Sequence, residues 1–199
     1  MNKTILFVIL QQFADWEAAY ITSAVNMLGQ GQYSIKTVSL SKDYVCSIGG
    51  FKVLPDYDIQ SVPDNYEALI LIGGMTWREE NAQQIKVLVE DCYNKGKVLG
   101  GICDASAFLG TTGVLNNVIH TSNDIKDLKQ WAGNAYTGEQ NYICRQVASD
   151  KNIITANGTA PMEFAKEILL ALDVASEEKI TEWYNFHKLG LFTAYVPVM

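Results

Sequence analysis

The sequence lacks the cysteine and histidine patterns that hold zinc. Its 199 residues contain four cysteines, none in a Cys-x-x-Cys pair, and only two histidines, so we expect no metal site. The cysteines do not indicate disulfides either, because no secretion signal accompanies them. The first apolar run, residues 4–10, is too short for a signal peptide or a membrane span. We therefore predict a cytoplasmic protein without a membrane segment.

A basic surface is missing as well. The chain carries 15 Lys and Arg against 22 Asp and Glu, a formal net charge of −7. Nucleic acids and anionic lipids attract basic surfaces, so neither is an expected partner. No repeat, linker or low-complexity segment interrupts the chain. The length fits one domain, residues 1–199, with a C-terminal helical extension at 175–199.

Strand-like apolar runs alternate with helical segments, which predicts an α/β fold. We expect a three-layer sandwich with a mostly parallel, flavodoxin-like central sheet. The predicted strands are residues 5–10, 33–40, 68–72, 98–102, 142–148 and 152–156, with a further hairpin at 45–54. The predicted helices are residues 17–28, 83–94, 123–131, 162–172 and 176–187. Ligands bind at the carboxyl ends of such strands, so the strand ends are expected to share one site.

The most informative segment is the apolar strand that runs directly into Cys103. The sequence at 101–105, Gly-Ile-Cys-Asp-Ala, has the form of a nucleophile elbow with Cys in place of Ser. A helix of small residues follows at once. Such a turn places the sulfur at a helix N-terminus, which favours the thiolate. The alternative is an ordinary buried cysteine.

A glycine pair ends the strand at 68–72 and predicts an oxyanion hole. Glycines let the backbone approach a ligand closely. The N–H groups of Gly74, Met75 and Asp104 are the expected donors to the oxyanion. The alternative is a plain turn at the end of a strand.

Two residues are candidate proton carriers. Glu17 opens the helix after the first strand, and burial against the sulfur would raise its pKa, so that its carboxyl could hold a proton. Asp15 is the better N-cap, which leaves Glu17 free for this role. His120 follows the elbow helix, and histidine is the usual base for a cysteine nucleophile, although a lone histidine is more often structural. Trp16 and Trp77 flank the site segments and either line a pocket or belong to the core or an interface.

At these residues the chain resembles the ThiJ/PfpI family, the cysteine branch of the class I glutamine-amidotransferase-like fold. The resemblance covers residues 3–172 and includes the strand–Gly–helix stretch at 154–165. It implies that Cys103 is the reactive centre, that Glu17 touches its sulfur, and that backbone N–H groups surround it. His120 resembles a family histidine that follows the elbow helix.

Two departures from the protease-like members of that family matter. Those members often have His directly after the cysteine, where this chain has Asp104. They also take an acid from a partner subunit after the glycine pair, where this chain has residues 76–79, Thr-Trp-Arg-Glu. A Cys-His-acid arrangement is therefore in doubt. Asp104 is left with three roles: orienting His120, repelling substrate carboxylates, or serving as a first-turn acid of the helix.

The resemblance implies a cysteine-dependent hydrolase, similar to intracellular proteases and amidases. We expect it to act without a cofactor on a peptide or small-molecule substrate, as a homodimer. Two alternatives stay open: conversion of 2-oxoaldehydes to hydroxy acids, and redox sensing through an oxidisable Cys103. The aromatic stretch at 183–196 packs either on the domain or across a subunit interface.

Overall fold

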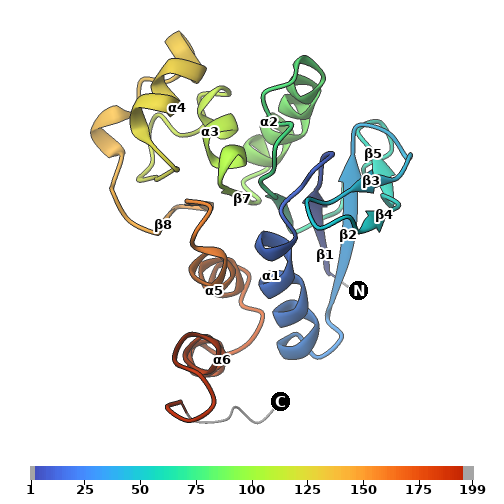
Figure 1. The fold of residues 1–199 in the computed structure, drawn as a ribbon, viewed down its shortest axis with the longest axis vertical. Coiled ribbons are helices and arrows are strands. Elements are labelled where there is room, and N and C mark those ends of the chain that lie inside the picture. Colours follow the sequence, from blue (N-terminus) through green and yellow to red (C-terminus); the bar gives the residue numbers. More distant parts are fainter. Residues whose placement is uncertain (1–2, 195–199) are drawn as a thin grey trace.

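A seven-stranded sheet forms the middle of the molecule, as the computed structural model of residues 3–194 shows (Figure 1). All neighbouring strands are parallel except the β8–β9 hairpin. A separate short antiparallel hairpin joins β3 (Val45–Cys46) and β4 (Lys52–Val53). The sheet strands in spatial order are β5 (Tyr57–Asp58), β2 (Tyr33–Ser39), β1 (Lys3–Val8), β6 (Ala68–Leu71), β7 (Val98–Ile102), β9 (Ile153–Ala156) and β8 (Val147–Asp150).

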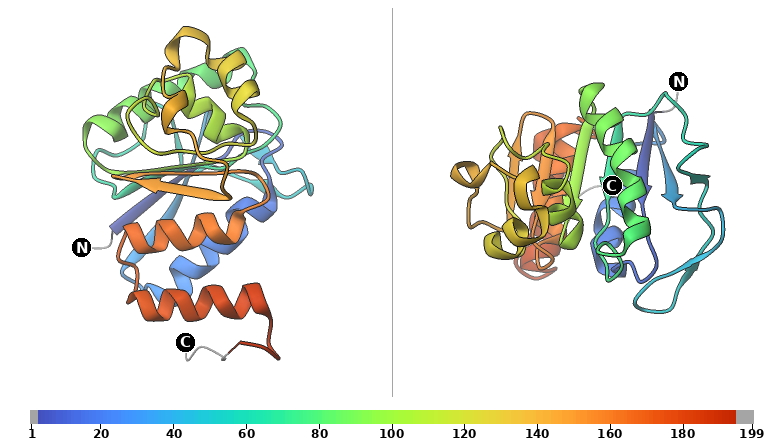
Figure 2. Two further views of the ribbon diagram at one scale, coloured as in Figure 1. Left: turned by 90° about the vertical axis from the view of Figure 1, so that its left-hand side faces the viewer. Right: turned by 90° about the horizontal axis from the view of Figure 1, so that it is seen from above.

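Helices cover both faces of this sheet, which gives three layers (Figure 2). One face carries α1 (Asp15–Leu28) and α5 (Pro161–Ala171), with α6 (Glu177–Leu189) packed outside them. On the side of the other face lie the 3-10 helices η1 (Glu80–Ile85), η2 (Gly133–Ala135) and η3 (Glu139–Asn141) and the α-helices α2 (Lys86–Asn94), α3 (Asp104–Gly110) and α4 (Ile125–Ala132). The predicted fold class, a three-layer sandwich on a mostly parallel sheet, is confirmed.

The alternation of side chains in the central strands explains the two cores. In β1, Ile5 and Phe7 point into the core beneath α1 and α5, whereas Leu6 and Val8 point into the opposite core. Successive side chains of a strand face opposite sides of the sheet, so a strand buried on both faces needs a continuous apolar run. This is why the N-terminal apolar run forms a central strand.

Several predicted boundaries need correction. Asp15 is the first residue of α1 and does not cap it; its Oδ2 accepts the N–H of Gly49 at 2.8 Å. The helix expected at 83–94 begins earlier, as η1, and ends before Gly96, whose φ of +63° suits a glycine. The strand expected at 142–148 is confined to β8, because residues 142–146 form a loop beside the candidate site.

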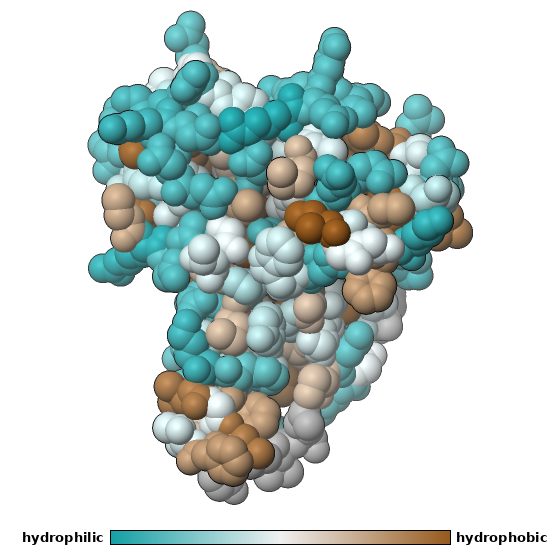
Figure 3. All heavy atoms as spheres, viewed as in Figure 1, coloured by the Kyte–Doolittle hydropathy of each residue, from teal (hydrophilic) through white to brown (hydrophobic). Residues whose placement is uncertain are grey.

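The aromatic C-terminal stretch packs on the domain in its first part. Trp183 is 2% exposed, and its ring meets Tyr20 of α1 edge to face. Beyond α6 the chain is exposed at Leu191 and Phe192. Figure 3 shows hydrophobic residues gathered at the lower end of the molecule, where α6 lies in Figure 1. Tyr195 and the residues that follow it lie outside the described residues. Within 3–194, no helix is both long and apolar enough to cross a membrane.

A buried hydroxyl ties the sheet to α5 and gives a test of the packing. The Tyr33 hydroxyl donates to the carbonyl of Leu172 at 2.6 Å. We expect Tyr33→Phe to lower the free energy of unfolding by about 1–2 kcal/mol, because it leaves this carbonyl without a partner. Urea unfolding measures the change. The exposed Tyr93 provides the control, since Tyr93→Phe should alter stability by less than about 0.5 kcal/mol. Equal changes in the free energy of unfolding for the two variants would contradict a buried hydrogen bond from Tyr33 to Leu172.

Candidate active site

Cys103 occupies the sharp turn between β7 and α3, as the elbow pattern predicts. Its φ is +59° and its ψ is −131°, a conformation that non-glycine residues rarely adopt. The N–H of Cys103 donates to the carbonyl of Ala156, and its own carbonyl accepts the Ser106 hydroxyl at 2.6 Å. These bonds fix the strained turn, and the thiol stays half-buried at the carboxyl edge of the sheet.

Glu17 reaches the same point from the first turn of α1 and is fully buried. Its Oε2 accepts the N–H of Gly73 at 2.8 Å. Its Oε1 makes no hydrogen bond within the described part of the chain. The thiol of Cys103 is the neighbouring side chain that lowers the pKa of the carboxyl. A methyl group added to Gly158 would lie 2.9 Å from the sulfur and 3.4 Å from Oε1. The thiol and the unpartnered oxygen therefore pack against one glycine.

Burial governs the ionisation of both acids. It raises the pKa of Glu17 to about 7, although the hydrogen bond from Gly73 and the neighbouring thiol of Cys103 oppose the shift. Burial and the negative charge of Glu17 together raise the pKa of Cys103. Two neighbouring acids of this kind titrate as a pair, and removing one proton leaves a single negative charge that they share. The neutral partner can then donate a hydrogen bond to the charged one.

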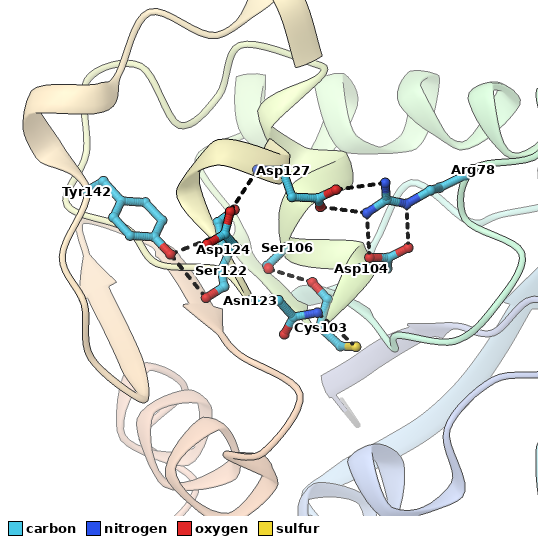
Figure 4. Close-up of polar contacts among 9 residues, drawn as sticks. All are labelled: Arg78, Cys103, Asp104, Ser106, Ser122, Asn123, Asp124, Asp127 and Tyr142. Atoms are coloured by element: carbon cyan, nitrogen blue, oxygen red, sulfur yellow. Dashed lines mark hydrogen bonds and ion pairs between the residues drawn. The ribbon is translucent and has the colours of Figure 1, made fainter. Parts of the chain in front are cut away.

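Two donors face the sulfur and favour its charged form. Asn123 Nδ2 lies 3.4 Å from Sγ (Figure 4). The backbone N–H of Asp104, at the start of α3, also acts on the sulfur. The other end of the Asn123 amide accepts the N–H of Gly158 at 2.8 Å, which fixes the orientation of the side chain. Both contacts lower the pKa of Cys103 and oppose the effect of burial. The sequence reasoning missed Asn123, which it placed at the start of a helix.

The turn after β6 supplies one free amide, that of Gly74, rather than the two predicted for Gly74 and Met75. The N–H of Met75 donates to the carbonyl of Gln12 at 3.2 Å, so it is not free to bind an oxyanion. The N–H of Gly74 has no acceptor among residues 3–194. Of the three predicted donors, Gly74 and Asp104 therefore remain, and the Met75 side chain is exposed.

His120 is not brought to the sulfur. Its Nδ1 hydrogen-bonds the carbonyl of Val118 at 2.8 Å, and its Nε2 hydrogen-bonds the Tyr136 hydroxyl at 2.6 Å. The ring is fully buried, and burial lowers its pKa, which disfavours a charged imidazolium. Both nitrogens are engaged away from Cys103, so the structure supports a structural role for His120.

Trp16 and Trp77 lie in different environments. Trp77 is fully buried, donates to the carbonyl of Ile72 at 2.8 Å and packs on Phe108, so it belongs to the core and does not line a pocket. Trp16 is 48% exposed at the start of α1, one residue from Glu17, where it is accessible to a substrate or a partner. Within residues 3–194 no cluster of His, Cys, Asp or Glu is arranged to hold a metal ion.

A cavity of about 500 Å³ is lined in part by Asn123, the residue whose amide contacts the sulfur. Arg145 is the cation on its wall, and the carboxylate of Asp124 accepts the N–H of Asp127. The thiol of Cys144 is also exposed there. Neutral polar side chains form most of the remaining lining: Thr121, Ser122, Asn123, Tyr142, Gln146 and Asn157.

The fold and this site define an α/β protein with a cysteine at a nucleophile elbow. The profile of the DJ-1/PfpI family matches residues 3–171, and the chain belongs to that family.

Curated relatives and solved structures agree with this assignment. The chain is 39% identical over 193 residues to the "Uncharacterized protease YdeA" of Bacillus subtilis (strain 168), covering 96% of this chain and 93% of that one. It is similar to a DJ-1 superfamily protein from Agrobacterium tumefaciens, with TM-score 0.85 and 34% identity over 94% of this chain and 98% of that one. A thiJ/pfpI family protein from Bacillus anthracis gives TM-score 0.86 and 30% identity over 94% and 91%.

The raised pKa of Glu17 makes stability depend on pH. The folded carboxyl loses its proton near pH 7 and the unfolded one near 4.5, so the folded state binds more protons between these values. We expect the free energy of unfolding to fall by about 3 kcal/mol as pH rises through this window. Glu17→Gln should remove most of this decline.

Chemical denaturation at a series of pH values tests the expectation. The exposed Glu90 provides a matched control, because Glu90→Gln removes a carboxyl without touching the site. Parallel stability curves for wild type and Glu17→Gln would contradict a buried, proton-holding Glu17.

Proposed function

We propose that the protein is a cysteine-dependent hydrolase in which Cys103 attacks a carbonyl carbon and Glu17 carries the proton. The observation that carries the proposal is the buried Glu17 Oε1, which has no partner other than the thiol beside it. An acid that titrates near neutral pH suits both giving and taking a proton. The Bacillus subtilis relative whose name describes a protease supports the same reaction class.

The reaction begins with the neutral Cys103 thiol and the Glu17 carboxylate, which takes the thiol proton as the sulfur becomes the nucleophile. The sulfur adds to the carbonyl carbon, and the N–H groups of Gly74 and Asp104 stabilise the oxyanion. Glu17 gives its proton to the leaving nitrogen as the carbon–nitrogen bond breaks, which leaves a thioester on Cys103. Water then attacks the thioester while the Glu17 carboxylate accepts its proton. The acid product leaves, and the original pair of groups is restored.

The cavity beside Asn123 is the expected place for the rest of the substrate. Its polar walls favour a polar group, and Arg145 favours one with negative charge. Asn123 lines this cavity and its amide lies 3.4 Å from the sulfur, so a substrate held there would have its carbonyl group close to Cys103.

Conversion of 2-oxoaldehydes is the second candidate. Because both ring nitrogens of His120 are engaged elsewhere, Glu17 is left as the proton carrier at the sulfur. A reaction without an amide leaving group needs only one such carrier. The thiolate would add to the aldehyde carbon, and Glu17 would move a proton from that carbon to the adjacent one, which leaves a thioester of the hydroxy acid on Cys103. Water would then hydrolyse the thioester, releasing the hydroxy acid and restoring the thiol.

Redox sensing remains the non-enzymatic candidate. The Asn123 amide, the N–H of Asp104 and a protonated Glu17 would all donate to the oxygens of an oxidised Cys103. Mass spectrometry after mild peroxide treatment measures oxidation at each of the four cysteines. Selective oxidation of Cys103 without turnover of any substrate would favour sensing.

Turnover of amides, peptides and 2-oxoaldehydes by the variants tests the enzymatic roles. We expect Cys103→Ala to abolish activity and Glu17→Gln to reduce kcat about 100-fold or more, because the proton carrier is lost. His120→Gln should retain the pH profile of kcat, since the ring does not contact the sulfur. Cys46→Ala is the control for loss of a half-buried thiol. Full activity of Cys103→Ala would refute the proposal.

A further inference from the structure

Arg78 lies four residues beyond the Gly74 turn, and its guanidinium holds two carboxylates at once. Nε and Nη2 donate to Asp104 at 2.9 and 3.0 Å, and Nη1 and Nη2 donate to Asp127 at 3.0 and 2.6 Å (Figure 4). The guanidinium carbon also lies 4.7 Å from the ring centroid of Trp131. All three guanidinium nitrogens donate to carboxylates, so this cation is committed to the protein and not to a ligand.

The two carboxylates belong to the segments that supply the donors to the sulfur. Asp104 follows Cys103 directly, and its own N–H donates to Sγ. Asp127 lies in the first turn of α4, four residues after Asn123, whose amide also reaches Sγ. Arg78 itself belongs to the segment that continues from Gly74. One guanidinium therefore connects the three stretches of chain that line the thiol.

The contact between Arg78 and Asp104 is important for the thiol because Asp104 carries a negative charge. The charged groups that act on Cys103 are Glu17 from α1 and Asp104 from α3, and the negative charge of each raises its pKa. Asp104 acts in the same direction on Glu17. An unpaired Asp104 carboxylate would thus oppose formation of the thiolate, and a bidentate cation offsets that charge.

We propose that Arg78 is a positioning residue of the Cys103 site, which neutralises Asp104 and holds α3 and α4 against the segment after Gly74. The proposal rests on the proposed function only in taking Cys103 as the nucleophile. Arg78 does not touch the sulfur and acts through Asp104 and Asp127.

A salt bridge with only a structural role would be expected to affect stability and not the thiol. The Arg78 and Asp127 side chains are 44% and 41% exposed, and pairs this exposed usually contribute little to stability. Lysine cannot replace the fork that holds two carboxylates, although it keeps the charge. The two parts of the proposal, charge and positioning, can therefore be separated by substitution.

The test is the pH dependence of Cys103 alkylation by iodoacetamide, with the modified cysteine identified by mass spectrometry. We expect Arg78→Met to raise the apparent pKa of the thiol by roughly one unit and to slow alkylation at neutral pH several-fold. In an Asp104→Asn background the same substitution should leave the pKa nearly unchanged, because the charge that Arg78 offsets is absent. Arg78→Lys should recover most of the pKa shift, but not the rate of substrate turnover.

Lys129→Met is the matched control. Lys129 is on α4 and pairs with Glu139 at 2.6 Å, so its loss removes a cation from the same helix without affecting Asp104. It should leave the thiol pKa at the wild-type value. Thermal melting verifies that each variant is folded, and Arg78→Gln, which also removes the charge, replaces Arg78→Met in the comparison with Asp104→Asn if Arg78→Met unfolds.

The outcomes separate this proposal from the proposed function. An Arg78→Met protein with the wild-type pKa, or a shift of the same size in the Asp104→Asn background, would overturn the role of Arg78 while leaving Cys103 as a nucleophile. Failure of wild-type Cys103 to react at any pH would instead remove the proposed function itself.

Discussion

Burial of the Glu17 carboxyl against the Cys103 thiol is the constraint on which the rest of the site depends. Two acids in one poorly hydrated space cannot both ionise, so the pair holds one proton near neutral pH. Their close approach needs backbone without side chains on both sides. A Cβ at Gly73 would lie 2.6 Å from that of Cys103, and one at Gly158 would lie 2.9 Å from its sulfur.

The parallel sheet explains how distant segments converge on this pair. Chain leaving the carboxyl ends of β1, β6, β7 and β9 supplies Glu17, the glycine pair, Cys103 and Gly158 in turn. The positive φ of Cys103 costs on the order of 1–3 kcal/mol, which the packed strands on either side must offset. The rigid strands and the strained turn together hold the sulfur where Asn123 and Asp104 can donate to it.

Local sequence patterns predicted the parts of the site that are built locally. The elbow at Cys103 follows from one strand, one turn and one helix, and the position of Glu17 follows from the end of β1. Asn123, the engaged amide of Met75 and the remote position of His120 depend on how long loops pack. The Met75 bond joins residues more than sixty positions apart, and the His120 ring is fixed by Tyr136. No spacing rule encodes such contacts.

The location of the shared proton is the central claim, and infrared spectroscopy tests it directly. The difference spectrum between wild type and Glu17→Gln, recorded from about pH 5 to about pH 9, isolates the carboxyl band of Glu17. The account predicts a protonated carboxyl band that persists to near pH 7, whereas the ultraviolet absorbance of the Cys103 thiolate, which Cys103→Ala abolishes, appears only at higher pH. A Glu17 carboxyl that is already ionised at pH 5, beside a neutral thiol, would contradict it.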